Sequence, residues 1–345
     1  MLPDEGACRV FLEQLVWPTG RFCPHCGGCE TWPIHSEAAR PGLFECRYCH
    51  GQFTVTTKTP LHATKLSLWT WIQAMYLIVS SSKGVSSVVL GRLIGVSQKS
   101  AWKVGHAVRE LMDLRHDVGP ALGGIVELDE KYVGGAPRFK EGVKHKRGKG
   151  TDKTPVFVAV ERKGEVRAAV IERDTKAIIG PHLERFVAPQ AHLMTDENAT
   201  YKELGAKYAS HRSVNHGAKE YARGSVFNNT AESFNAILER AKVGVFHWLS
   251  KRHLQRYVDE VVWRWNHREP VEKCDHRTSI RYIAFEPMEP LKLLAYLLEK
   301  VVGRQVRRSD DGGLLWPDRP QPVEDDAADL EIVPVPSCAP TSSAA

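Results

Sequence analysis

The spacing of hydrophobic positions changes several times along the chain. Up to about residue 60, apolar residues are scattered among Cys, Gly, Pro and His. From there to about residue 114, apolar and aromatic residues recur at helical spacing. Strand-like and helical patterns then alternate as far as about residue 268, and the chain after residue 309 is Pro- and Asp-rich. We therefore expect five segments. They are a cysteine-rich segment 1–60, a helical region 61–117, a domain of alternating strands and helices 118–270, a helical extension 271–308 and a disordered acidic tail 309–345.

The third segment carries the clearest alternation of elements. We predict strands in "GIVELDEKYV", which starts at residue 124, and in "AHLMTD", which ends at residue 196. "PVFVAVERKGEVRAAVIE" is typical of two strands joined at Lys163-Gly164. Helices are expected in "TKAIIGPHLERFV", "AESFNAILERA" and "LSKRHLQRYVDEVVWRWNHR", whose tryptophans fit the buried stripe. This order predicts an α/β domain with a mixed sheet covered by helices.

Two CxxC turns, "CPHC" and "CRYC", contain the candidate metal ligands of the first segment. Four thiolates on two such turns can surround one Zn²⁺, so we predict zinc at Cys23, Cys26, Cys46 and Cys49. Cys29 is a spare whose spacing fits less well, and free buried thiols are the alternative. Because a four-cysteine site leaves no open position for substrate, its expected role is structural.

The stretch "SSVVLGRLIGVSQKSAWKVGHAVRELM", residues 86–112, has the pattern of a helix-turn-helix. Gly95-Val96 would form the turn and Ser97 the N-cap. Gln98, Lys99 and Ser100 would lie exposed at the start of the second helix, where a recognition helix contacts bases. The positions expected to face a core are Val88, Val89, Leu93, Ala101, Val104, Val108 and Leu111. An ordinary helical hairpin is the alternative.

Charge adds a possible partner. The net charge is only +6, but residues 138–153 concentrate basic side chains, among them Lys144, Lys146, Arg147 and Lys149. Such a run favours a polyanion, although a solvated loop would look the same. No apolar run is long enough for a membrane span, and the acidic start of the chain does not resemble a secretory signal. We expect a cytoplasmic protein.

Acidic residues end two of the predicted strands. Glu127 and Asp129 would point to one face of the first, Leu128 and Glu130 to the other, and Asp196 follows the fourth strand. Strand-end carboxylates can hold two Mg²⁺ ions for an in-line phosphoryl transfer. Glu232, in the first turn of a predicted helix, would complete the set. Structural roles are also possible, because Asn229 and Glu232 fit a capping box and Asp196 can cap a turn.

Several stretches together resemble a known family. "ELDEKYVGG", "TDENATYKEL", "VNHGAKEYARG" and the long run that starts at "NNTAESFNAILERA" are similar to the DDE transposases of bacterial insertion sequences. The cysteine segment and "HGQFTVTTKTPLHATKLSLWTWIQAM" resemble the zinc-ribbon branch, the insertion-sequence 1595 family. The resemblance implies a ribonuclease-H-like domain, Mg²⁺ dependence and DNA transposition.

Carried over residue by residue, the resemblance makes Asp129, Asp196 and Glu232 the catalytic acids. Asn229 is a secondary candidate for the third, and His216 is a candidate near the site. A basic residue of the family falls on Glu239 here, so that Arg240 or Lys242 would have to contact phosphate instead.

The expected function is therefore a transposase that binds terminal inverted repeats, then cuts and joins DNA, as a homo-oligomer on DNA. A catalytically decayed or domesticated DNA-binding protein is the alternative, and Glu239 favours it. A zinc hydrolase of small substrates fits poorly, because the cysteine site is closed and no His pair occurs at i, i+4.

Overall fold

The computed structural model describes residues 4–113, 119–135, 141, 151, 153–214, 222–299, 301–305, 307–308 and 314–315. These residues form two compact units. The first comprises residues 1–80, 87–111 and the chain from 289 onward, and the second comprises 81–86 and 112–288. None of the helices in the described ranges has the length and apolar character needed to cross a bilayer.

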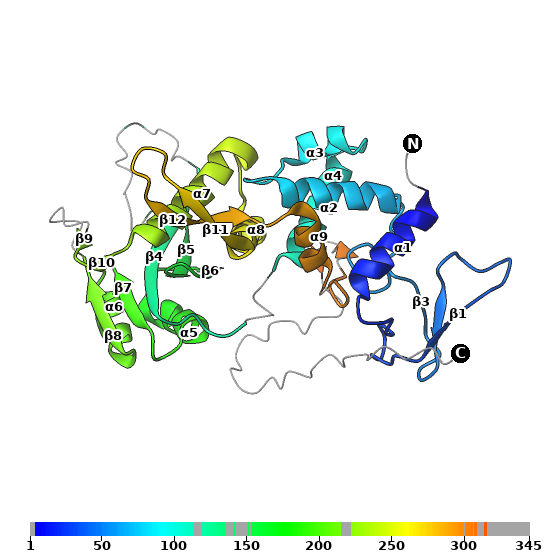
Figure 1. Ribbon diagram of the computed structural model, residues 1–345, viewed down its shortest axis with the longest axis horizontal. Coiled ribbons are helices and arrows are strands. Elements are labelled where there is room, and N and C mark those ends of the chain that lie inside the picture. The colour runs from blue at the N-terminus through cyan, green and yellow to red at the C-terminus, as the bar shows by residue number, and fades with distance from the viewer. Residues whose placement is uncertain are drawn as a thin grey trace. The chain divides into compact units, whose positions relative to one another are not determined.

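The first unit contains a small antiparallel sheet and a set of helices (Figure 1). The sheet has the order β1-β2-β3 and is followed by helices whose apolar sides are buried. Its elements are α1 (Glu5–Val16), β1 (Thr31–Pro33), β2 (Phe44–Cys46), β3 (Gln52–Phe53), α2 (Leu68–Ser80), α3 (Ser87–Leu93), α4 (Gln98–Leu111) and α9 (Pro290–Glu299), with a short pair β13 (Arg307–Arg308) and β14 (Leu314–Leu315).

A five-stranded mixed sheet organises the second unit, with the order β6-β5-β4-β7-β8. The three strands β4, β5 and β6 are antiparallel neighbours, whereas β7 and β8 run parallel to β4. This order confirms the predicted α/β class and its ribonuclease-H-like mixed sheet. The strands are β4 (Ile125–Val133), β5 (Thr154–Glu161), β6 (Val166–Val170), β7 (His192–Thr195) and β8 (Ser210–Ser213).

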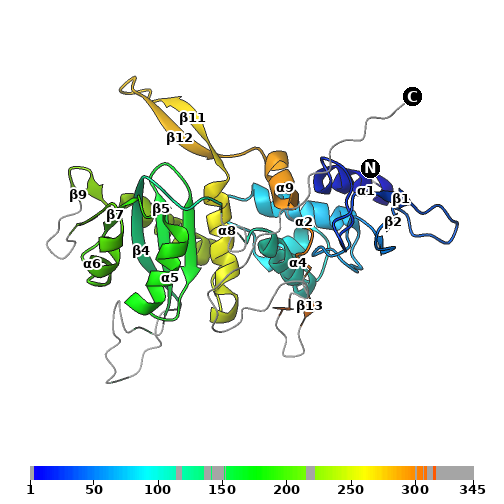
Figure 2. The same cartoon turned by 90° about the horizontal axis from the view of Figure 1, so that it is seen from below.

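Helices cover both faces of this sheet, which explains its continuous apolar runs (Figure 2). In β5, Phe157 and Ala159 belong to the core shared with α5 (Lys176–Phe186) and α6 (Thr200–Leu204). Val158 and its neighbours two positions away belong to the opposite core, which α7 (Asn229–Ala241) and α8 (Leu254–Asn266) complete. The sheet is therefore the middle layer of three. A single-turn 3₁₀ helix (Gly205–Lys207) follows α6, and the short strands β9 (Ala222–Arg223) and β10 (Val226–Phe227) precede α7.

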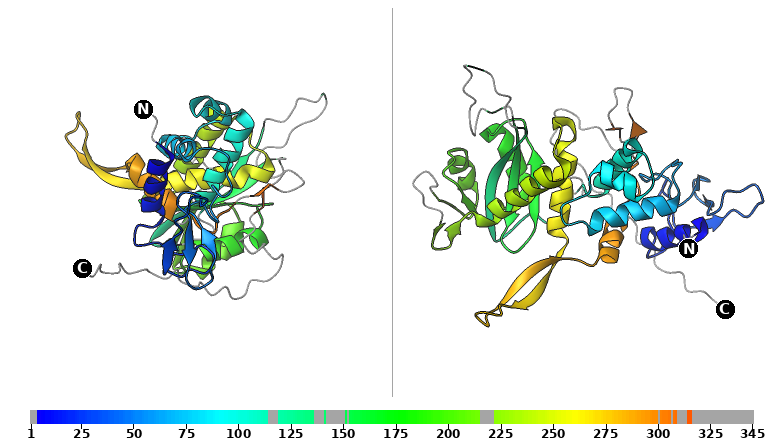
Figure 3. Two further views of the ribbon diagram at one scale, coloured as in Figure 1. Left: turned by 90° about the vertical axis from the view of Figure 1, so that its right-hand side faces the viewer. Right: turned by 90° about the horizontal axis from the view of Figure 1, so that it is seen from above.

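Residues 268–287 form a long hairpin rather than a helix. Strands β11 (Arg268–Cys274) and β12 (Arg281–Pro287) pair only with each other among the described elements, and the hairpin extends away from α8 in both Figure 2 and Figure 3. The helical extension expected from residue 271 is therefore wrong in its first half, and only α9 is helical there. A turn over residues 275–279 joins the two strands. It is closed by the N–H groups of Arg277 and Ser279, which donate to the side chain and the main-chain oxygen of Asp275.

Candidate metal centres

The pairing of β4 with β7 brings the two aspartates toward each other, although Asp129 lies in the middle of β4 and not at its end, whereas Asp196 directly follows β7. The strands are parallel, and Glu127 is the register partner of Met194. Extending that register by two residues, beyond the last paired residues, would set Asp129 opposite Asp196. Asp196 Oδ1 also accepts the N–H of Asn198 at 3.0 Å, so the turn-capping role allowed by the sequence is present as well.

The environment of Asp129 places the other two predicted acids near it. Its Oδ1 accepts the N–H of Glu130 and its Oδ2 accepts the side-chain amide of Asn235, each at 2.8 Å. Burial is the main cause that raises the pKa of Asp129 to about 6, and the negative charges of Asp196 and Glu232 raise it further against these hydrogen bonds. Asp129 thus lies in an excess of negative charge, which a divalent cation would neutralise.

Glu127 explains how α7 is held against β4. This side chain is fully buried and lies two residues before Asp129 on the same face of the strand. Its Oε2 accepts the main-chain N–H groups of Thr230 and Ala231 at 2.6 and 3.1 Å, and its Oε1 accepts Arg162 Nε at 2.5 Å. A carboxylate from β4 therefore caps the N-terminus of α7, the helix that carries Glu232.

This arrangement replaces the capping box expected from Asn229 and Glu232. The N-cap position is Asn228, whose amide instead donates to the main-chain oxygen of Leu128 at 3.0 Å. Asn229 is the first helical residue and is exposed, and the Glu232 N–H bonds the Asn228 main-chain oxygen at 3.1 Å. The capping interpretation was wrong because the stronger acceptor comes from a strand about a hundred residues earlier.

On the opposite face of β4, Glu130 belongs to a separate polar cluster. It pairs closely with the Tyr201 hydroxyl, and Asn198 lies 3.5 Å from both Glu130 and Asp174. Burial is the largest cause that raises the pKa of Glu130 to about 8, and the charges of Asp174 and Asp129 add to it. The acid alternation predicted for this strand is correct, since Glu127 and Asp129 face α7 while Glu130 faces α6.

The residues around Asp129 fit a divalent cation by chemistry, since carboxylates are the ligands of Mg²⁺. The three acids do not all lie within 4.8 Å of one another, a spacing that only the four-cysteine group reaches among the described Cys, His, Asp and Glu side chains. Mg²⁺ does not require such a cluster, because it usually keeps several waters and is bound through one or two carboxylates together with substrate phosphates.

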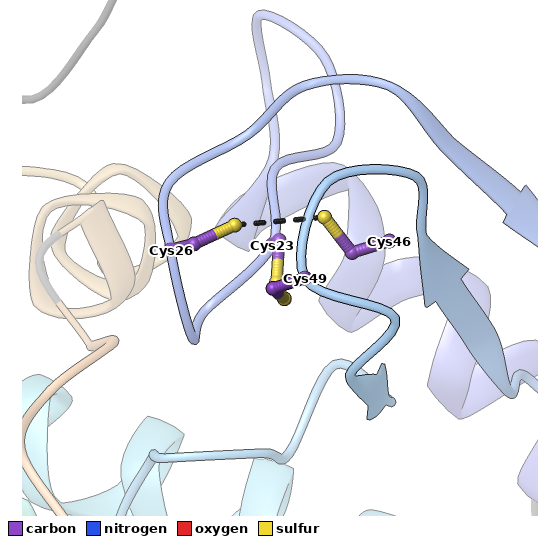
Figure 4. A group of neighbouring side chains, drawn as sticks. All are labelled: Cys23, Cys26, Cys46 and Cys49. Atoms are coloured by element: carbon purple, nitrogen blue, oxygen red, sulfur yellow. Dashed lines mark hydrogen bonds between the residues drawn. The ribbon is translucent and has the colours of Figure 1, made fainter.

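The four cysteines meet as predicted (Figure 4). Cys23 Sγ lies 3.6 Å from Cys49 Sγ, and Cys26 Sγ lies 3.5 Å from Cys46 Sγ. A tetrahedral site with zinc–sulfur bonds of about 2.3 Å requires sulfur separations of about 3.8 Å. Cys29 is not part of the group. These four cysteines thus fit one structural Zn²⁺.

The two turns that carry the cysteines have matching backbone hydrogen bonds. Cys23 accepts the N–H of Gly27 at 2.9 Å, and Cys46 accepts the N–H of His50 at 3.0 Å. Burial raises the pKa of Cys23 to about 12. For Cys46, burial opposes ionisation, but N–H donors from Cys49 and Tyr48 and the neighbouring thiols lower its pKa to about 7. A ready thiolate of this kind is the form that binds metal.

Helices α3 and α4 have the predicted helix-turn-helix order, with one error in the buried face. The Ser97 hydroxyl accepts the N–H of Ser100 at 3.2 Å, and Gly95 has the positive φ of a helix-ending turn. Gln98 and Lys99 are exposed and Ser100 is half-buried, as the start of a recognition helix would require. All four residues expected in the core of α4 are buried.

The apolar residues predicted to bury α3 are instead on its outside. Val88, Val89 and Leu93 are about half exposed, and Leu90 and Ile94 fill the core in their place. The spacing of apolar residues on so short a helix allows two faces, and the close approach of Gly91 to the main chain of Val96 selects the other one. The side of α3 that faces the core is therefore not the one predicted from the sequence.

Glu239, at the position where the resemblance expects a basic residue, forms ion pairs with two lysines. Its Oε1 lies 2.8 Å from Lys242 Nζ, and its Oε2 lies 3.5 Å from Lys131 Nζ. Lys131 is on β4, two residues beyond Asp129 on the same face. Lys242, one of the two basic candidates, is thus fixed near the strand, whereas Arg240 is exposed. His216, Lys144, Lys146, Arg147 and Lys149 lie outside the described residues.

The strand order and the covering helices define an α/β domain with a ribonuclease-H-like mixed sheet, preceded in the chain by a four-cysteine module. Two family models match the chain: the transposase zinc-ribbon domain over residues 3–52 and the ISXO2-like transposase domain over residues 121–266. Together they span more than half of the chain, which belongs to the IS1595 family of transposases.

Searches beyond the family models give weaker matches. No curated protein matches the chain. Among solved structures, the chain is similar to one in the simian T-cell lymphotropic virus intasome in complex with PP2A regulatory subunit B56 gamma, at 11% identity and a TM-score of 0.26, covering 60% of this chain and 77% of that one. It is also similar to the Mos1 strand transfer complex at 12% identity and a TM-score of 0.25, covering 57% and 73%. These scores carry no further conclusion.

Proposed function

We propose that this transposase cuts and joins DNA at a divalent-metal site formed by Asp129, Asp196 and Glu232. The observation that carries the proposal is the position of Asp129, a partly buried carboxylate with the charges of Asp196 and Glu232 both acting on it. Asn229 is the weaker candidate for the third acid, because its exposed side chain begins the helix while Glu232 lies one turn further on.

When bound, Mg²⁺ would supply charge neutralisation and an activated water or 3′-hydroxyl for the phosphoryl transfer. The protein's part is positioning. Asn235 and the Glu130 N–H fix both oxygens of Asp129, and the Asn198 N–H fixes one oxygen of Asp196. Because these donors hold the carboxylates before DNA arrives, little reorganisation is needed at the moment of reaction.

DNA recognition is assigned to residues of both units. We propose that the zinc ribbon and the residues 86–112 bind the terminal inverted repeats, with Gln98, Lys99 and Ser100 at the base edges and the basic residues from Lys144 to Lys149 at phosphates. A homo-oligomer on DNA follows from the need to bring two element ends together. The alternative, a DNA-binding protein without cleavage, loses part of its support because two lysines occupy the neighbourhood of Glu239.

Strand cleavage at the element ends tests the proposal. A DNA fragment that carries the gene with flanking sequence on both sides is incubated with protein and Mg²⁺ or Mn²⁺, and new 3′-ends are mapped by primer extension. Wild type should nick at the element boundaries, and Asp129→Ala should bind the same DNA without nicking it. Glu172→Ala, which removes an exposed acid of the same domain, is the matched control and should cleave normally. Binding without any cleavage by wild type would favour the non-catalytic alternative.

A further inference from the structure

The segment that follows α7 exposes a large aromatic side chain. After α7 the helix widens into a π-helical turn, Lys242–Phe246, and Trp248 follows with 74% of its surface exposed. Val243 in the same turn is 59% exposed. An indole is seldom left in water to this extent in a folded domain, because burying it is strongly favourable. The exposed indole is therefore a large apolar surface that is open to a ligand.

The backbone that presents Trp248 is strained. His247, just before it, has φ 57° and ψ −45°, and the Trp248 N–H donates to the Phe246 main-chain oxygen at 2.6 Å. These are the marks of a γ-turn of the rare, strained kind. The turn is anchored from beneath, since the Phe246 ring packs 4.6 Å from that of Tyr257. Strain of this kind persists where the surrounding structure imposes it, and it is concentrated at ligand sites.

Trp248 lies beside the continuation of the catalytic strand. A Cβ atom on Gly135 would be 3.5 Å from Trp248 Cζ3, so the indole covers the backbone just beyond the end of β4. Gly135 follows Asp129 by six residues, which in extended chain is at most about 20 Å. Lys131 lies between these two points on the strand, and Glu239 joins it to Lys242. Lys251 and Arg252, both exposed, follow in the next turn, the 3₁₀ helix Lys251–His253.

A flat, exposed aromatic ring next to ordered cations is the arrangement that binds single-stranded nucleic acid, in which bases stack on side chains and phosphates meet lysines. We propose that Trp248 stacks on an unpaired base of a DNA strand whose phosphates pass Lys131 and Lys242 toward Asp129. The ligand class is single-stranded or frayed DNA near the cleaved end. This proposal rests on the proposed function, because it takes DNA to be the substrate at Asp129.

Oligothymidylate of about 20 nucleotides is a suitable probe, since aromatic platforms bind about 4–16 nucleotides without sequence preference. Fluorescence anisotropy with the full chain should show that Trp248→Ala weakens binding about tenfold or more, while Trp248→Phe keeps most of the affinity. The matched control is Val243→Ala, an exposed apolar residue of the same turn, which should bind as wild type. Photocrosslinking with a 5-iodouracil-substituted oligonucleotide should yield an adduct at Trp248.

Two results would overturn the assignment. Equal binding by wild type and Trp248→Ala would exclude stacking, and so would a crosslink confined to other residues, while Asp129-dependent end cleavage would be untouched by either. Conversely, Trp248-dependent oligonucleotide binding without any end cleavage by wild type would leave the stacking site standing and reject the catalytic proposal. The two ideas therefore fail separately.

Discussion

Replacing Glu127 by alanine should lower the free energy of unfolding by about 3–5 kcal/mol, although Glu127 is not proposed to touch metal or DNA. The substitution leaves Arg162 in a nearly dry site without its carboxylate, and it removes the acceptor of two N–H groups at the start of α7. Urea unfolding followed by circular dichroism measures the loss. Glu127→Gln should cost less, because an amide oxygen can still accept from Thr230 and Ala231.

Glu127→Ala should also lose more cleavage activity than its loss of stability explains. Glu127 ties the helix that carries Glu232 to the strand that carries Asp129, and a displacement of about 1 Å in such a site can cost about 100-fold in rate. Cleavage is measured at a temperature where the variant is folded. Glu184→Ala, which removes the Lys207–Glu184 ion pair of this unit, is the matched control; both side chains are more than half exposed, so only about 0–1 kcal/mol and little activity should be lost. Full cleavage by folded Glu127→Ala would contradict this positioning role.

Asp129→Asn should separate catalysis from stability, with the two changing in opposite directions. Cleavage should fall by about a thousandfold or more, as expected when a metal ligand and its charge are lost. Without divalent metal at neutral pH, however, the variant should be more stable than wild type by on the order of 1–2 kcal/mol. The reason is that the folded-state pKa of Asp129, about 6, lies above its ordinary value of 3.8, so ionisation opposes folding.

The sign of the pH dependence follows from linkage. Between about pH 4 and 6 the folded chain retains a proton on Asp129 that the unfolded chain has released, so this residue's contribution to stability falls as the pH rises. Asp129→Asn should flatten that part of the curve in urea unfolding experiments in buffer without Mg²⁺ or Mn²⁺, with the zinc left bound. Mg²⁺ should stabilise wild type and leave the variant unchanged. A variant less stable than wild type at neutral pH without metal would show that burial and the surrounding acids do not oppose ionisation of Asp129.

Much of the architecture could be predicted from the sequence because apolar periodicity encodes it locally. The strand in "GIVELDEKYV" and the hairpin at Lys163-Gly164 are β4, β5 and β6, and the helices ending at Phe186 and Asn266 lie where their periodicity predicts. The indole of Trp265 packs edge-on against Phe234, in keeping with its place in the buried stripe. The approach of Asp129 to Asp196 was also predictable, because they belong to strands that a mixed sheet places side by side, although β4 continues past Asp129 to Val133.

Tertiary contacts decided what the sequence could not. Glu127 looked like one more strand-end acid, and only the packing of α7 on β4 makes it the cap of that helix. Asn235, the partner of Asp129, resembled any polar residue between Phe234 and Leu238. The hairpin of residues 268–287 buries few side chains, so its alternation of apolar and polar residues is weak. The sequence pattern therefore does not distinguish it from a helical extension. On α3, a seven-residue helix, the buried face depends on the neighbour that packs against it.

The central claim is that these carboxylates bind the catalytic metal, and a change of ligand type tests it most directly. Asp196→Cys offers a thiolate, which Mg²⁺ accepts poorly and Mn²⁺ accepts more readily. End cleavage by Asp196→Cys should therefore be absent with Mg²⁺ and return with Mn²⁺, whereas wild type should cleave with both. Cleavage by Asp196→Cys at the wild-type rate in Mg²⁺ would contradict a metal-binding role for Asp196 and, with it, the proposed site.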